Sequence, residues 1–360
     1  EGEEWLHYRR IMNKLMLRPG SEQSLYDTCD VVGQDLVSYW NTKYSGKEVY
    51  DLDNSLYMWS INNMLAVMLG DKYKQHQKGL QDIVQRFAVV VQMIFRESSR
   101  LSLIPAKLAA YFKVPAWKNF VSSVDEAIAL ANSLMTQLIP VCKDGNGLLV
   151  AMLREGIEHK YVVRILADLV LAAGDTTAYT TQWMLYLLAK NKELQDEIYE
   201  EVKNTTNIEN IAQLPLLRGV LRETLRLYPV APFLTRYLPQ DSLIGGYHVP
   251  AGELVILSLY SSGRDTKNFP RSDEFWPHRW CRDTDNGNYK GVSSPYASLP
   301  FAMGARSCIG RKIAEVQTSL TIAQVIKHFK LELVDKEPVD MVLRLVAVPS
   351  RPIRIWLTVR

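Results

Sequence analysis

Residues Phe301–Gly310 read FAMGARSCIG and lead from a long polar stretch directly into a predicted helix. Cys308 therefore stands just before a helix N-terminus, where free backbone N–H groups and the helix dipole stabilise a thiolate. Gly304 and Gly310 permit tight turns and let a flat ligand approach the backbone closely. Arg306 adds a cation that can hold a carboxylate by paired hydrogen bonds. A lone cysteine is more often a small buried apolar residue, so the surrounding residues decide its meaning.

The pattern FxxGxRxCxG fixes five positions and resembles the haem-binding loop of the cytochrome P-450 family. The resemblance implies that Cys308 is the axial thiolate ligand of the iron in haem b, a ligand that favours O–O cleavage in this family. Phe301, Arg306 and Gly310 would then contact the haem. The resemblance also implies the family's mainly α fold with small β-sheets, in one domain over residues 1–360.

Glu223 and Arg226 stand three residues apart in a predicted helix, so they can form an ion pair on one helical face. Alone, this spacing is weak evidence, because it occurs by chance in many helices. With Arg279 of the FWPHRW segment, it resembles the family's ExxR and PxRF/W segments. The resemblance implies a structural Glu223–Arg226–Arg279 network that holds the cysteine loop. Buried ion pairs often contribute geometry rather than net stability.

Trp5 and Arg9 match the WxxxR pattern of the family's C helix. The same spacing also fits an amphipathic helix with a packed Trp and a solvated Arg. The resemblance implies that both residues contact a haem propionate, and that Arg236 supplies another propionate ligand. Three cations, Arg9, Arg236 and Arg306, would then face two carboxylates.

Composition sets broad limits: 47% of the 360 residues are hydrophobic, 22% are charged, and the net charge is +3. These values are typical of a globular protein and too weakly basic to indicate nucleic acid. The four cysteines are scattered without a CxxC pair, and no HExxH zinc motif occurs. The matching motifs run from residue 5 to residue 311, and the chain begins at the C helix. We therefore expect a fragment that lacks the family's N-terminal region, with its targeting segment and one wall of the substrate pocket.

Apolar periodicity predicts a series of helices followed by strands. Residues 265–300 show no clear period, and so long an irregular segment is usually functional. Strands are predicted within 243–260 and in FKLELV (329–334), LRLVAV (343–348) and IRIWLTV (353–359). The predicted helices span about 3–17, 23–41, 53–69, 78–96, 116–140, 159–190, 191–203, 213–227 and 309–328.

The helix predicted over 159–190 carries AAGDTT at residues 172–177, a poor helix-forming stretch. It resembles the family's I-helix pattern, with Ala173 where the family usually has Gly. Gly174 and the Thr hydroxyls permit a bulge that makes room for dioxygen. The resemblance implies that Thr176 hydrogen-bonds the oxygen species and that Asp175 relays protons from solvent. The alternative is a kinked core helix with satisfied hydroxyls.

Arg218 and Arg222 share one helical face and resemble the basic pair with which mitochondrial members bind an adrenodoxin-like ferredoxin. The GRKIAE stretch at 310–315 is similar to the GRRxAE of that branch. The spacing alone equally fits two solvated arginines. The resemblance implies a mitochondrial enzyme on the matrix side of the inner membrane. Residues 102–117, SLIPAKLAAYFKVPAW, either touch a membrane or pack over the substrate pocket.

The expected pocket positions are apolar, which suits a lipophilic substrate: Leu171, Ala172, Val230, Ala231, Phe233 and Leu343. The overall sequence most resembles arthropod mitochondrial hydroxylases of ecdysteroid synthesis, above all the steroid 2-hydroxylase branch. The expected function is hydroxylation of a steroid with O2 and electrons from a ferredoxin. The alternatives are another mitochondrial-type sterol, secosteroid or xenobiotic hydroxylase, a non-oxidative thiolate-haem isomerase, and a haem sensor.

Overall fold

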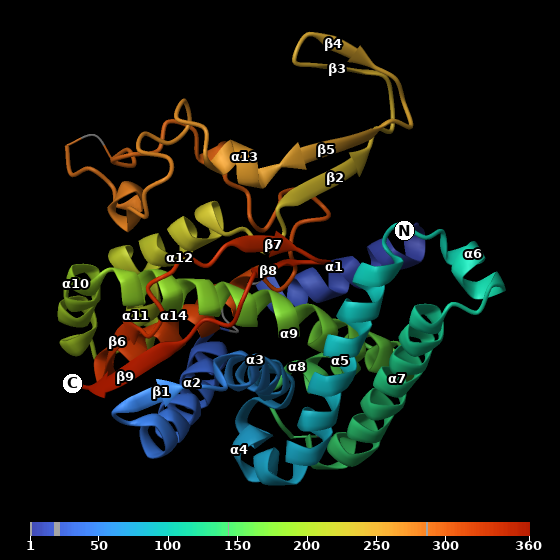
Figure 1. Ribbon diagram of the computed structural model, residues 1–360. Helices are drawn as coiled ribbons and strands as arrows, with labels where there is room; N and C mark the ends of the chain where they lie inside the picture. The colour runs from blue at the N-terminus through green and yellow to red at the C-terminus, as the bar shows by residue number, and fades with distance from the viewer. Residues whose placement is uncertain (1, 18–21, 143, 286) are drawn as a thin grey trace.

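The computed structural model describes residues 2–17, 22–142, 144–285 and 287–360. The chain is mainly helical, with small antiparallel sheets formed largely by its last third (Figure 1). This confirms the predicted fold class. The longer helices are α1 (Glu3–Leu17), α2 (Glu22–Tyr44), α3 (Leu52–Leu69), α5 (Gln81–Leu101), α7 (Pro115–Cys142), α9 (His159–Lys190), α10 (Lys192–Lys203), α12 (Pro215–Leu227) and α14 (Arg311–His328).

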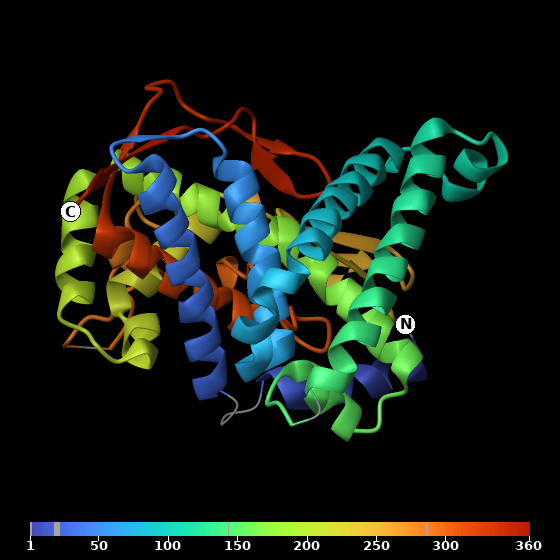
Figure 2. The same ribbon diagram turned by 90° about the horizontal axis from the view of Figure 1, so that it is seen from below.

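Short helices fill the connections between the long ones. Among them, α6 lies at the far end of the α5–α7 pair, which extends to one side of the molecule (Figures 1 and 2). The short helices are α4 (Tyr73–His76), α6 (Ala106–Tyr111), α8 (Leu148–Arg154), α11 (Ile208–Gln213) and α13 (Leu259–Gly263), and the 3-10 turns are η1 (Gly70–Lys72), η2 (Gln77–Leu80), η3 (Pro277–Trp280) and η4 (Pro295–Ala297).

Helix α9 crosses the middle of the molecule, and α3 packs along it (Figures 1 and 2). Its apolar positions recur at helical spacing, and its second half is almost wholly buried. Ser60 Oγ of α3 donates a 2.7 Å hydrogen bond to the carbonyl oxygen of Ala173 in α9. This bond fixes α3 beside the AAGDTT stretch.

Strand β9 (Ile355–Val359) lies between β1 (Lys47–Val49) and β6 (Phe329–Leu333), antiparallel to both. A ribbon of β2 (Phe233–Tyr237) and β5 (Leu254–Ser258) carries the β3–β4 hairpin (Ser242–Ile244, Tyr247–Val249) away from the helices (Figure 1). The β7–β8 hairpin (Met341–Leu343, Ala347–Pro349) lies beside α9.

Most predicted helices are confirmed within two or three residues at their ends. The helix predicted over 78–96 is displaced, because 3-10 turns occupy residues 77–80 and α5 continues to Leu101. The prediction of one strand over LRLVAV is wrong: Arg344, Leu345 and Val346 form the turn between β7 and β8. The short helices α4, α6, α8 and α11 were not predicted, since pieces of four to seven residues carry too little periodicity.

Candidate active site around Cys308

The loop over residues 301–310 folds back on itself through two backbone bonds. Cys308 N–H donates to the Phe301 carbonyl oxygen at 2.8 Å, and Ser307 N–H donates to the Gly304 carbonyl oxygen at 3.0 Å. Gly304 has φ +79°, a conformation that glycine adopts without steric cost. Gly310 caps α14, so Cys308 precedes a helix start as the sequence predicts. The thiol is exposed.

Several groups act on the pKa of the Cys308 thiol. The protein around it raises the pKa by desolvation, even though solvent reaches the side chain. An N–H from Gly310 and the positive charges of Arg9 and Arg311 act in the opposite direction. The donors that favour a thiolate are therefore already arranged around the sulfur.

Helix α1 contacts the cysteine loop through Trp5 and Arg9. Arg9 Nη2 donates a 2.6 Å hydrogen bond to the Ser307 carbonyl oxygen. The Arg306 guanidinium lies 3.7 Å from the centroid of the Trp5 ring, in cation–π geometry. The structure thus brings Trp5, Arg9 and Arg306 together beside Cys308.

This cluster fits the carboxylates of a haem. Arg9 Nε is buried and has no hydrogen-bond partner among the described residues. The pKa of Arg9 is lowered, first by burial and also by the positive charge of Arg306. Two guanidinium groups that repel each other, one with an unused N–H donor, would be stabilised by a propionate between them. The residues present therefore suit a haem whose iron is held by Cys308 sulfur.

Arg236 lies in β2 and is exposed. Its Nη1 donates to the neighbouring Thr235 carbonyl oxygen at 2.7 Å. No contact in the described part of the chain joins it to Arg9 or Arg306, so a propionate-binding role for Arg236 stays a prediction.

Glu223, Arg226 and Arg279 form a fully buried ion-pair network. Arg226 Nε and Nη2 donate to the two carboxylate oxygens of Glu223 at 2.9 and 2.8 Å. Arg279 Nε donates to Glu223 Oε1 at 2.9 Å. Trp280 Nε1 and the backbone N–H of Trp276 complete the shell of the carboxylate, each at 2.9 Å. Nothing in the sequence indicated the two Trp donors beyond their place in FWPHRW.

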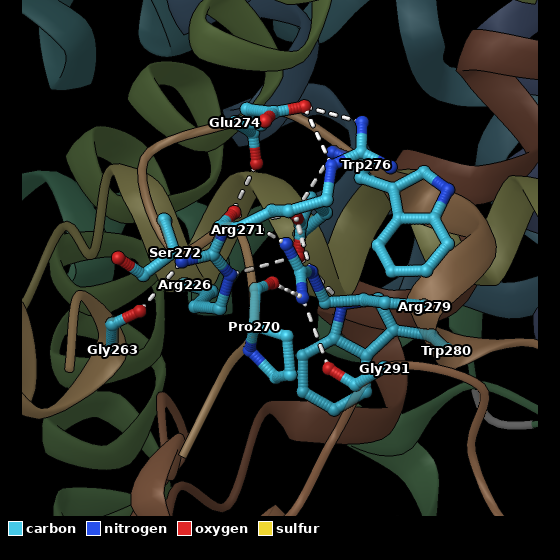
Figure 3. Close-up of polar contacts among 11 residues, drawn as sticks. Arg226, Gly263, Pro270, Arg271, Ser272, Glu274, Trp276, Arg279, Trp280 and Gly291 are labelled. Carbon is cyan, nitrogen blue, oxygen red and sulfur yellow. Dashed lines mark hydrogen bonds and ion pairs between the residues drawn. The ribbon is translucent and has the colours of Figure 1, made fainter. Parts of the chain in front are cut away.

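The two arginines also hold the irregular segment that precedes the cysteine loop (Figure 3). Arg279 donates to the carbonyl oxygens of Pro270, Arg271 and Gly291, at 2.7, 2.9 and 3.0 Å. Arg226 donates to the carbonyl oxygens of Ser272 and Glu274 and to that of Gly263, the last residue of α13. A segment without regular secondary structure thus satisfies its carbonyl groups on buried guanidinium donors.

Helix α9 carries hydroxyl-to-carbonyl bonds from Thr176 of AAGDTT onwards. Thr176 Oγ1 donates to the Ala172 carbonyl oxygen at 2.7 Å, and Thr180 and Thr181 each bond the carbonyl four residues earlier at 2.8 Å. The helix continues through this stretch without a π-helical or 3-10 turn. The expected bulge is therefore not formed as a change of helix type. The hydroxyl bonds are added to carbonyl oxygens of a helix that stays continuous.

Asp175 is 5% exposed, and burial raises the pKa of its carboxyl to about 6. The hydroxyl of Tyr57, in α3, opposes this rise in the pKa. Tyr57 Oη nevertheless has no hydrogen-bond partner in the described chain, so the two groups are neighbours without bonding geometry. No sequence pattern indicated Tyr57, which belongs to a helix more than a hundred residues earlier in the chain.

The cytochrome P450 family model matches residues 1–357. The chain is a cytochrome P450. It is 35% identical to cytochrome P450 315a1, mitochondrial, of Drosophila melanogaster. That match covers the whole of this chain and 70% of the relative. It is also 29% identical to the mitochondrial cholesterol side-chain cleavage enzyme of Oncorhynchus mykiss and to the mitochondrial sterol 26-hydroxylase of Rattus norvegicus. These matches cover 99% of this chain and 71% and 70% of the relatives.

As a member of this family, the chain is a haem-binding monooxygenase, as the sequence predicted. The relatives that are named as hydroxylases favour a monooxygenase over the isomerase and sensor alternatives. Among the described residues, no helix combines the length and the apolar character that a membrane crossing requires.

The predicted substrate positions of this P450 differ in exposure. Val230 is buried and Leu171 half-buried, whereas Ala172, Ala231, Phe233 and Leu343 are exposed. The Val230 carbonyl oxygen accepts a 2.9 Å hydrogen bond from Ala347 N–H of β8. Because Ala347 pairs with Leu343, this bond brings the β7–β8 hairpin to the segment after α12.

A basic groove of about 700 Å³ lies beside the cysteine loop, with Phe301 and Ala302 in its wall. Among its lining residues, the only acidic one in the described chain is Glu315. Arg222 donates to the Tyr289 hydroxyl at 2.8 Å, and Arg218 donates to Gln213 Oε1 at 2.9 Å. The cations that line the basic groove are Arg218, Arg222, Arg282, Arg311 and Lys312.

Proposed function

We propose that this P450 hydroxylates a steroid-like substrate in mitochondria, with Cys308 as the iron ligand and a ferredoxin as the electron donor. The observation that carries the proposal is the arrangement of the Cys308 loop. Its thiol stands beside a Gly310 N–H and the Arg9 cation of α1, in a loop whose Phe301 and Ala302 line the basic groove. In the reaction, one oxygen atom of O2 enters a C–H bond and the other leaves as water. Two electrons and two protons are consumed.

When bound, the haem supplies the one-electron chemistry that activates dioxygen. The chain's own residues hold it and deliver protons. Cys308 sulfur would bind the iron, while Arg9 and Arg306, with Trp5 behind them, would bind propionates. Phe301 and Gly310 would contact the porphyrin.

Asp175 and Thr176 suit proton delivery because of their charge state and bonding. A carboxyl group whose pKa is about 6 can both take and give a proton near neutral pH. The Thr176 hydroxyl has a single donor hydrogen, which bonds the Ala172 carbonyl, so its lone pairs remain free to accept. Thr176 can donate to an oxygen ligand only after its hydroxyl leaves that carbonyl.

The basic groove suits an acidic ferredoxin. Charge complementarity of this kind mainly governs docking rate and orientation. Arg218 and Arg222 are the predicted docking pair, and Arg282, Arg311 and Lys312 extend the same sign of charge around them.

The proposed substrate class rests on two of the relatives, whose names describe cholesterol side-chain cleavage and sterol 26-hydroxylation. The proposed pocket residues are all apolar, which favours a rigid lipophilic substrate. Within that class we propose an ecdysteroid precursor, on the overall resemblance to arthropod mitochondrial hydroxylases.

Helix α6 supports a peripheral contact with the membrane, which we propose to be the matrix side of the mitochondrial inner membrane. Leu103, Tyr111 and Phe112 are 94%, 79% and 70% exposed at the end of the α5–α7 pair (Figure 1). Lys107 and Lys113 stand among them, a mixture that favours an interfacial segment.

The decisive experiment is the absorption spectrum of the reduced, CO-bound protein and of its Cys308→Ser variant. Wild type should show the red-shifted Soret band of a thiolate-ligated haem, and the variant should lose it. A variant that keeps this band would reject Cys308 as the ligand. Turnover of a steroid panel with a ferredoxin and its reductase then tests the substrate class, with no turnover of any steroid counting against it.

A further inference from the structure

Tyr57 of α3 lies directly against the AAGDTT stretch of α9. Its side chain is 3% exposed, and its hydroxyl oxygen has no hydrogen-bond partner in the described chain. A Cβ built on Gly174 would lie 2.8 Å from Tyr57 Oη and 3.1 Å from Tyr57 Cζ. The tyrosine therefore reaches the α9 backbone only because residue 174 is glycine.

A buried hydroxyl without a partner is unusual in a native structure and calls for an explanation. Asp175, the residue after Gly174, is the neighbouring group that can supply the partner. Its carboxylate accepts hydrogen bonds, and a tyrosine hydroxyl donates one. Tyr57 lowers the pKa of Asp175 against the larger effect of burial. Burial and Asp175 together raise the pKa of Tyr57, so its hydroxyl keeps the proton that it would donate.

The other titratable groups near this pair come from the same two helices and one hairpin. Tyr179, one turn after Asp175 in α9, has its pKa raised to about 12, first by burial and then by Asp175 and Asp53. Arg344, in the β7–β8 turn, opposes that rise. In the described chain, no charged side chain of α7, α12 or β6 contributes to the pKa of Asp175.

We propose that Tyr57 is a positioning residue for Asp175: its hydroxyl donates a hydrogen bond to the ionised carboxylate and holds it ready for proton delivery. The bond forms when the Asp175 side chain turns towards α3. Gly174, which stands one position after the glycine usual in this family, admits the tyrosine. The inference rests on the proposed proton-delivery role of Asp175.

The test is the titration of Asp175 in the haem-loaded protein by infrared difference spectroscopy. The Asp175 carboxyl band is identified as the one that Asp175→Asn removes. In Tyr57→Phe, which keeps the ring and loses the hydroxyl, the titration should move up by about one pH unit, a tenfold change in the ionisation equilibrium. The pH profile of product formed per reducing equivalent consumed should move in the same direction.

Tyr73→Phe is the matched control. Tyr73 is 2% exposed in α4, and its hydroxyl bonds Asn62 rather than a group of α9. Its loss should leave the Asp175 titration unchanged. Gly174→Ala provides a second variant, because the added methyl group would displace the Tyr57 hydroxyl and should produce the same upward shift.

An Asp175 titration that is identical in wild type, Tyr57→Phe and Gly174→Ala would overturn the proposal. A different result would reject the proposed role of Asp175 itself. Unchanged coupling in Asp175→Asn would reject proton delivery by Asp175, while the infrared titration would still decide whether Tyr57 bonds its carboxylate.

Discussion

Arg9 Nη2 donates a 2.6 Å hydrogen bond to the carbonyl oxygen of Ser307, a residue 298 positions later in the chain. The bond ties the first helix to the loop that carries Cys308. The same guanidinium keeps a second, buried N–H without a partner in the described chain. Arg9 therefore holds the cysteine loop and keeps a donor whose hydrogen bond a bound anion would accept, so its substitution should affect both functions.

Arg9→Ala should lower haem retention, because it removes the Ser307 bond and a propionate donor. A hydrogen bond to a charged group contributes about 1.5–3 kcal/mol, so haem should dissociate at least tenfold faster. Transfer of haem to an excess of an apo-globin measures this rate. Arg10→Ala is the control, since Arg10 is exposed on the same helix. Equal rates for the two variants would contradict the role of Arg9.

Glu223→Gln should destabilise the fold strongly. It leaves Arg226 and Arg279, 1% and 0% exposed, without the carboxylate that compensates their charges. Removing one partner of a buried ion pair costs about 3–5 kcal/mol. Urea unfolding of the haem-loaded protein measures the loss.

Glu274→Gln serves as the comparison for Glu223. Glu274 pairs with Arg271 at the surface, with both side chains more than half exposed. Exposed pairs contribute about 0–1 kcal/mol, so this variant should unfold almost like wild type. Similar losses in both variants would show that burial of the Glu223 network is unimportant.

The sequence predicted the elements whose residues are close together or belong to long periodic segments. Glu223 and Arg226 share a helix, and Cys308 precedes one, so their short motifs could be matched to those of the family and their arrangement proposed. In the described chain the sequence also located the nine longer helices, although the prediction for α5 is displaced, because their apolar residues recur over several turns.

The sequence did not reveal contacts between segments that are distant in the chain. Tyr57 meets Gly174 only after α3 has packed along α9, and neither residue has a local feature that indicates the contact. Trp280 joins Glu223 across 57 positions for the same reason. Short elements such as β7 and β8 were misjudged because three-residue strands depend on their partners, here the Val230 segment and α9.

Asp175→Asn should stabilise the protein at neutral pH. The pKa of Asp175 is raised to about 6 in the folded chain from an ordinary 3.8, so the folded state binds the proton more tightly than the unfolded state. The stability from this proton is complete below pH 4 and is lost as pH rises through about 6. The ionised carboxylate therefore costs on the order of 3 kcal/mol at neutral pH.

Urea unfolding at several pH values tests the direction of this change in stability. The advantage of Asp175→Asn over wild type should be largest above about pH 6 and disappear near pH 4. Asp125→Asn, an exposed carboxylate of α7, is the control and should show little difference at any pH. An Asn variant that is less stable than wild type at neutral pH would refute the prediction.

Gly174→Ala should be destabilising in wild type and better tolerated in Tyr57→Phe. The added Cβ would lie 2.8 Å from Tyr57 Oη, and overpacking of this kind costs about 1–3 kcal/mol. Without the hydroxyl, the gain of roughly 1 kcal/mol in helix propensity offsets much of the remaining strain. A double-mutant cycle from urea unfolding measures the coupling.

The control for this cycle is Gly79→Ala, where an added Cβ meets nothing within 4 Å. Its effect should be the same with and without Tyr57→Phe. A coupling energy of zero between Gly174→Ala and Tyr57→Phe would mean that the hydroxyl does not limit residue 174.

Arg218→Glu should weaken the use of the ferredoxin without affecting haem binding. Arg218 lines the basic groove, and its hydrogen bond to Gln213 is a surface contact, so the substitution leaves the Glu223 network intact. Arg222 is less suitable for this test, because its guanidinium lies over the rings of Trp280 and Tyr289.

In the Arg218→Glu variant, the KM for ferredoxin should rise several-fold at low salt and approach the wild-type value as salt screens the charges. Lys107→Glu, on exposed α6, gives the same change in net charge and should leave this KM unaltered. An equal effect of both reversals would point to overall charge and reject the groove as the docking surface.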